Sequence, residues 1–207
     1  MAKVIKFQRA EPAKFGLKRV KGRKKVNLEE FGQLNMFAAP PPAGKVVNLS
    51  PRLSPFETAL TLDEQEDELA KEAYHKAIQA GDSIADAYCN LGILEFQSGD
   101  VVKGIDCFSR SLKSDPRHFQ SHYNLGNIYS EEGNLTLARL HYEVCLEVAP
   151  EFPHVYYNLG LVLALIKDYK EAIDVLTRFT QLAQEEDWGN ALELLDGLKV
   201  SLLTPNS

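Results

Sequence analysis

Long apolar runs are absent from this 207-residue sequence, and cysteine is scarce. No stretch approaches the roughly 18 apolar residues that a membrane-spanning helix needs, and the first residues lack the apolar core of a signal peptide. The three cysteines are odd in number and have no metal-binding spacing, which fits a reducing compartment and not a disulfide framework. We therefore expect a cytoplasmic protein without a membrane span.

Motifs for catalysis and metal binding are also missing. The sequence contains no phosphate-binding glycine loop, nucleophile elbow or carboxylate pair. His118 and His122 are four residues apart, as are His141 and Cys145, so each pair could share a helix face. A zinc site needs three or four converging ligands, and neither pair has an obvious third. We expect no enzyme activity, no catalytic residue, no metal site and no cofactor.

Charge is present but unevenly distributed. Residues 1–25 contain ten lysines and arginines and one acid, a net charge of +9. The other residues hold 13 cations against 28 acids, a net charge of −15. This asymmetry indicates a basic interaction arm on an acidic body.

A Leu-Gly pair recurs with a period of 34 residues, each time preceded by an asparagine. The three copies are Asn90-Leu91-Gly92, Asn124-Leu125-Gly126 and Asn158-Leu159-Gly160. Tyr88, His122 and Tyr156 lie three residues before the leucines, and Pro116 and Pro150 lie at equivalent positions 34 residues apart. A fixed period of this length is typical of a solenoid built from supersecondary units.

These units resemble the tetratricopeptide repeat (TPR), and several residue types recur in register. The resemblance implies an all-α fold, a TPR superhelix of antiparallel helix pairs. Full repeats would span residues 85–118, 119–152 and 153–186. A partial repeat would span 57–82, its first helix decayed because Glu57 and Thr58 stand where Leu-Gly is expected. With a capping helix over 187–203 they would form a TPR domain over 51–207, preceded by a basic, largely disordered arm and Pro-rich linker over 1–50.

Local signals support these boundaries. Asp100, Asn134 and Asp168 suit the N-cap of each second helix. A glycine inside a helix costs roughly 1 kcal/mol relative to alanine, so Gly126 and its two equivalents predict close approach of the paired helix.

The resemblance also implies a ligand groove lined by the first helix of each pair. The predicted groove residues are Asp86, Cys89, Ile93, Phe96, Gln120, Tyr123, Asn127, Ser130, His154, Tyr157, Leu161 and Leu165, and the predicted groove-supporting residues are Asn90, Asn124 and Asn158. In the alternative interpretation, roughly half of these side chains pack within the scaffold and do not contact a ligand, because tyrosines also pack between repeats.

Residues 85–98, 119–132 and 153–166 contain no lysine or arginine. Relatives that hold acidic chaperone tails use cations in this groove, so we expect no binding of such tails. The main prediction is an adaptor that binds an apolar or basic peptide segment of a protein partner.

Three interpretations of the arm stay open. It is a solvated tail, or residues 3–25 make weak contact with nucleic acid or an anionic surface through their cations. Alternatively, Gln33, Leu34, Met36 and Phe37 belong to a segment that resembles the bacterial sliding-clamp-binding pentapeptide. The alternative function is then a DNA-associated factor, tethered through the arm, whose TPR domain recruits a second protein.

The opposite charges of arm and body lead to a further hypothesis. The arm would fold back into the groove and compete with the external ligand, so deleting residues 1–44 should raise the affinity of the groove for that ligand.

Overall fold

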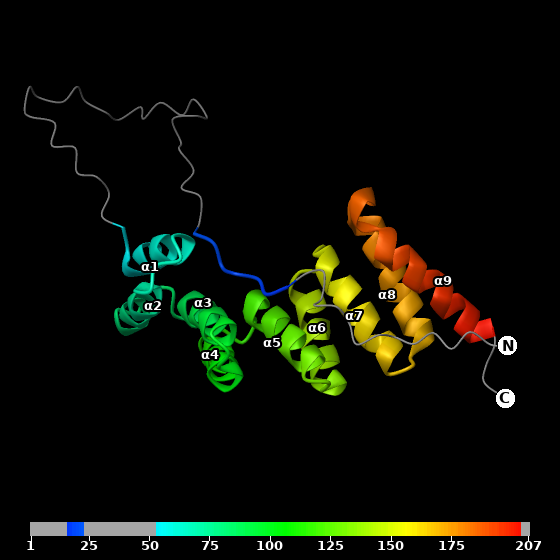
Figure 1. Ribbon diagram of the computed structural model, residues 1–207, viewed down its shortest axis with the longest axis horizontal. Helices are drawn as coiled ribbons and strands as arrows, with labels where there is room; N and C mark the ends of the chain where they lie inside the picture. Colours follow the sequence, from blue (N-terminus) through cyan, green and yellow to red (C-terminus); the bar gives the residue numbers. More distant parts are fainter. Residues whose placement is uncertain (1–15, 23–52, 204–207) are drawn as a thin grey trace, which may run out of the picture. The chain divides into compact units, whose positions relative to one another are not determined.

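The computed structural model describes residues 16–22 and 53–203, and its regular structure in these ranges is entirely helical (Figure 1). The described residues form two compact units. One contains residues 16–20 and 84–203, and the other contains residues 21–22 and 53–83. The predicted all-α fold of paired antiparallel helices is confirmed.

Three helix pairs follow one another in the larger unit (Figure 1). Each second helix packs on the first helix of its own pair, and each pair contacts the next. The pairs are α3 (Ile84–Gln97) with α4 (Val101–Ser114), α5 (Phe119–Glu131) with α6 (Leu135–Val148), and α7 (Pro153–Leu165) with α8 (Tyr169–Leu182). The 3-10 turn η2 (Glu185–Asp187) and helix α9 (Gly189–Leu203) come next, and α9 packs on α8.

The second helices begin where the sequence predicts. The side chains of Asp100, Asn134 and Asp168 each accept a hydrogen bond from the backbone N–H three residues later, at 3.0–3.3 Å. These bonds satisfy N–H groups that have no partner within the helix. The predicted N-caps are therefore confirmed.

The helical glycines lie where the paired helix comes closest. A Cβ atom on Gly126 would be 2.6 Å from the Tyr142 ring, and one on Gly160 would be 2.5 Å from Leu176. Gly92 faces Phe108 in the same way, at 3.0 Å. Large buried side chains of the second helix thus occupy the space that the missing Cβ leaves, which confirms the predicted close approach.

The smaller unit differs from the sequence prediction because it contains a complete helix pair. Helix α1 (Pro55–Glu64) packs on α2 (Ala70–Gln79) although it has no Leu-Gly pair. A reciprocal capping box of Ser54 and Glu57 starts α1, and proline follows the cap. The hydroxyl of Tyr74 donates to Asp63 at 2.9 Å and joins the two helices. Local capping therefore forms a first helix where the repeat pattern has been lost.

Across residues 16–22 and 53–203, no helix is both long enough and apolar enough to span a bilayer.

Candidate peptide-binding site

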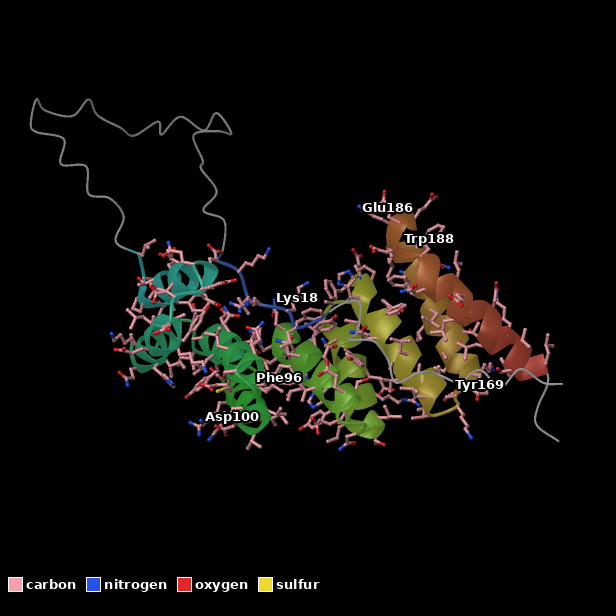
Figure 2. The ribbon with its side chains drawn as sticks, viewed as in Figure 1. Lys18, Phe96, Asp100, Tyr169, Glu186 and Trp188 are labelled. Atoms are coloured by element: carbon pink, nitrogen blue, oxygen red, sulfur yellow. The ribbon has the colours of Figure 1, made fainter. Side chains whose placement is uncertain are left out.

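Four residues of the arm, Leu17–Val20, lie along the first helices of the larger unit. Leu17 and Val20 pack against a buried apolar cluster from α3, α4 and α5. This cluster consists of Cys89, Ile93, Phe108, Leu125 and Ile128. Figure 1 shows the segment as an extended blue trace, and Figure 2 labels Lys18 on it. The surface of α3, α5 and the start of α7 that contacts Leu17–Val20 is called the peptide site below.

Two asparagine side chains hold the backbone of this segment. Asn124 accepts a hydrogen bond from the Lys18 N–H at 2.7 Å and donates one to the Lys18 carbonyl at 3.1 Å. Asn90 does the same for Val20, at 2.8 and 3.0 Å. A side-chain amide carries one acceptor and one donor group, so it can pair with both polar groups of one residue as a neighbouring strand does. This recognition is independent of the segment's side chains.

The spacing of these contacts defines a register. Lys18 and Val20 are two residues apart, whereas Asn124 and Asn90 are one repeat apart. In an extended chain, alternate residues direct their backbone groups to the same side. The segment therefore advances two residues per repeat and runs opposite to the order of the repeats.

An aromatic pair contacts the cation of the segment. The Lys18 ammonium lies 3.4 Å from the centroid of the Phe152 ring and 5.6 Å from that of Phe119. The two rings meet edge to face, with centroids 5.0 Å apart and an interplanar angle of 82°. On the next residue, the Arg19 guanidinium donates to Gln97 at 2.9 Å in an exposed position. The first helices α3, α5 and α7 contain no lysine or arginine, and Lys18 and Arg19 belong to the segment.

The structure places some predicted groove residues at the peptide site. Cys89 and Ile93 belong to the cluster beneath Leu17 and Val20, and Phe96 packs against that cluster. Burial raises the pKa of the Cys89 thiol to about 12, so this side chain is a neutral part of the lining. Asp86 is half-buried, and its carboxylate lies 2.9 Å from Nε2 of His118.

Other predicted groove residues belong to the scaffold around α5 and α7. Asn127 is buried and accepts hydrogen bonds from Tyr142 at 2.6 Å and from Asn158 at 2.9 Å. Tyr123 is buried and accepts a hydrogen bond from Asn158 at 3.1 Å. Tyr157 is buried against Phe179, with ring centroids 5.3 Å apart.

The last predicted positions are less buried. Four of them are half-buried, namely Gln120, Ser130, His154 and Leu161. Leu165 is exposed. The ring of His154 meets Phe152 edge to face at 5.0 Å, which brings it beside the aromatic pair.

Sequence reasoning missed the aromatic pair and gave the asparagines a different role. Asn90 and Asn124 were expected to support the groove, whereas here their amides contact the segment directly. Phe119 is the first residue of α5 and Phe152 is the N-cap of α7. Aromatic residues at the start of two successive first helices were the signal that could have identified them.

Several predictions concern residues outside the described ranges. The clamp-like motif Gln33, Leu34, Met36 and Phe37 lies there, as does most of the basic stretch 3–25. In the part of the chain that the structure describes, no three His, Cys, Asp or Glu side chains gather as a metal site.

The helix pairs and the regularly spaced asparagines define an α-helical repeat protein. Family models described as tetratricopeptide repeat match residues 107–139 and 153–186. The chain is a tetratricopeptide repeat protein. Domains of this family typically bind proteins or peptides.

Sequence relatives share part of the chain. Anaphase-promoting complex subunit 3 of Schizosaccharomyces pombe is 25% identical over 122 residues, which are 59% of this chain and 18% of that protein. The matches cover about a fifth of the length of the curated relatives.

Solved structures share the fold. The first TPR of Spaghetti (RPAP3), bound to an HSP90 peptide, has a TM-score of 0.53 and 18% identity, covering 57% of this chain and 93% of that one. YrrB, described as a TPR protein with an unusual peptide-binding site, has a TM-score of 0.58 and 23% identity, covering 64% and 67%.

Proposed function

We propose that the protein is an adaptor that binds an extended apolar or basic peptide segment of a partner protein at the peptide site. The observation that carries this proposal is the paired contact of Asn90 and Asn124 with the backbone of Val20 and Lys18. Both amides are fully buried and both engage a segment that belongs to no helix. Any extended peptide could form the same hydrogen bonds through its backbone if it replaced this segment.

The charge of the lining favours some peptides over others. The first helices of the three pairs contain no lysine or arginine that could neutralise carboxylates. The structural neighbour from Spaghetti binds an HSP90 peptide, and we propose that this chain does not bind acidic chaperone tails. The site fits a peptide of apolar and basic residues, because an apolar cluster contacts Leu17 and Val20 and an aromatic pair contacts Lys18.

The alternative function stays a hypothesis. A DNA-associated factor would depend on the basic residues 3–25 and the motif Gln33–Phe37. Most of these residues are outside the described ranges, whereas Lys18 and Arg19 are described and contact the peptide site.

The test uses full-length protein whose own segment has been displaced. Leu17→Asp with Val20→Asp, called the displaced-segment variant, puts charge against the apolar cluster and should free the peptide site. A fluorescent peptide of residues 16–22 should bind this variant in an anisotropy titration. Adding Asn124→Leu removes two backbone hydrogen bonds and should weaken binding about tenfold or more.

The matched control is Asn190→Leu, because Asn190 is an exposed asparagine on α9. It should leave the affinity unchanged, and circular dichroism should show that both variants stay helical. Equal affinity of the Asn124 and Asn190 variants, or no binding by the displaced-segment variant, would contradict the proposed function.

A further inference from the structure

We propose that Phe119 and Phe152 form a lysine-recognition subsite and that the partner carries an extended apolar–Lys–x–apolar sequence. This inference rests on the proposed function, and it names the chemistry that the peptide site selects. The segment Leu17-Lys18-Arg19-Val20 of this chain has that sequence and shows how each position is read.

The lysine position is read by an aromatic face. The Lys18 ammonium lies within contact distance of the Phe152 ring, at 3.4 Å from its centroid, and Phe119 borders the same space at 5.6 Å. The face of an aromatic ring carries partial negative charge and attracts a cation within about 6 Å. An uncharged side chain of equal length would keep the apolar contact and lose this attraction.

Neighbouring rings of the repeats hold Phe119 and Phe152 in place. Phe152 meets Phe119, His154 and Tyr123 edge to face, with centroid distances of 5.0, 5.0 and 5.8 Å. Phe119 also stacks on Tyr123, whose own side chain is buried. Because neighbouring rings already restrict them, the side chains of Phe119 and Phe152 lose little conformational freedom when a peptide binds. This favours the affinity and the selectivity of the subsite for that peptide.

The backbone contacts fix which residue of the peptide reaches the rings. Asn124 bonds to both backbone groups of Lys18 itself, so the residue held by Asn124 is the residue that meets Phe152. The residue before it and the residue two places after it reach the apolar cluster, as Leu17 and Val20 do. At the position between, Arg19 donates a hydrogen bond to Gln97 at an exposed edge.

The experiment compares peptides that differ by one lysine. The parent probe is the fluorescent peptide of residues 16–22, titrated with the full-length displaced-segment variant. The first altered probe carries Lys18→Met, which keeps an unbranched side chain, one heavy atom shorter, and removes its charge. The matched control probe carries Lys21→Met, which removes the same charge from an exposed position. We expect the first change to weaken binding about five- to tenfold and the control to change it less than twofold.

A protein variant completes a double-mutant cycle. Phe152→Leu in the displaced-segment variant keeps apolar volume and removes the ring, so it should weaken binding of the parent probe. It should not weaken binding of the Lys18→Met probe further, because the two changes remove one interaction. The peptide changes test the subsite even if Phe152→Leu perturbs folding.

The outcomes separate the inference from the proposed function. Equal affinities of the parent and Lys18→Met probes would overturn the lysine subsite and leave peptide binding intact. Equal losses with Lys18→Met and Lys21→Met would also overturn it, because general charge attraction would then explain both. Failure of every probe to bind the displaced-segment variant would overturn the proposed function itself.

Discussion

His122 and His141 face each other between α5 and α6, with their Nδ1 atoms 2.9 Å apart. Burial and the neighbouring ring of His122 lower the pKa of His141 to about 4. Burial also lowers the pKa of His122, although its hydrogen bond to the Pro116 carbonyl opposes the shift. Tyr129 stacks on His141, with ring centroids 5.5 Å apart. Both rings are therefore held in the neutral form at pH 7.

This pair predicts a loss of stability in mild acid. The unfolded chain takes up protons on these rings near their ordinary pKa of 6.5, whereas in the folded chain the pKa of His122 is lowered and that of His141 is about 4. The folded state thus binds fewer protons, and the free energy of unfolding falls as the pH drops from 6.5 to 4. We expect a loss on the order of 1–2 kcal/mol from His141, allowing for solvent at the half-buried ring.

Urea unfolding at several pH values between 7.5 and 4 measures this loss. His141→Phe keeps the ring on Tyr129 and should flatten the dependence relative to wild type. His75→Asn, at an exposed position, should keep the wild-type slope. An unchanged slope in His141→Phe would show that the acid sensitivity arises elsewhere.

The asparagines show what the sequence can predict about single residues. Their 34-residue period identifies Asn90, Asn124 and Asn158 as equivalent positions. Nevertheless, Asn124 bonds to Lys18, while Asn158 bonds to Tyr123 and Asn127 within the scaffold. The three positions are alike in sequence, and their hydrogen-bond partners come from other repeats and from the arm. Pattern alone therefore locates the asparagines without assigning their partners.

At the scale of helices, the distance between α5 and α6 depends on Gly126. The Tyr142 ring that fills the space above this glycine is 1% exposed, and its hydroxyl donates to Asn127 at 2.6 Å. That bond prevents the ring from tilting away from an added methyl group. The fit between these helices thus requires both the missing Cβ atom and the anchored tyrosine.

Gly126→Ala should therefore destabilise the protein despite the higher helix propensity of alanine. Overpacking costs about 1–3 kcal/mol against a propensity gain of roughly 1 kcal/mol, so we expect a net loss of up to about 2 kcal/mol in urea unfolding. Gly92→Ala is the comparison, because Phe108 lies farther away, at 3.0 Å, and has no hydroxyl anchor. It should cost clearly less, and equal losses at both sites would refute this explanation of the packing.

Helices were predictable where the repeat pattern or a cap signal was strong. The boundaries of α4, α6 and α8 follow from their N-caps and from the glycines or turns before them. Helix α1 was missed because it lacks the repeat pattern, although Ser54, Pro55 and Glu57 form a local start signal. A cap signal is local and could have been found, whereas the contact of α1 with α2 depends on tertiary packing.

For the whole molecule, the charge asymmetry now has a structural counterpart. The basic arm, with a net charge of +9 over residues 1–25, includes the segment that occupies the peptide site of the acidic body. A tethered ligand has an effective concentration in the millimolar range when its linker can span the distance. The segment Leu17–Val20 should therefore compete with any partner peptide that uses Asn90 and Asn124.

Displacing the segment should raise the affinity of the full-length chain for an external peptide. The displaced-segment variant loses the apolar contacts of Leu17 and Val20, so a probe of residues 16–22 no longer competes with an intramolecular ligand. We expect its affinity to rise about tenfold or more over wild type, and deletion of residues 1–44 should have the same effect.

The matched control for this comparison is Leu192→Asp with Val200→Asp, which makes the same two changes on α9. These side chains are 47% and 59% exposed, so the control alters net charge equally while leaving the peptide site occupied. Amide chemical shifts of α3 and α5 should move in the displaced-segment variant and not in the control. If both variants bind the probe as wild type does and those shifts stay unchanged, the segment does not occupy the site in solution. A gain in affinity for the probe in the displaced-segment variant alone would instead show that a partner must displace the arm before it binds. The affinity of the arm for the peptide site would then set the partner concentration at which binding begins.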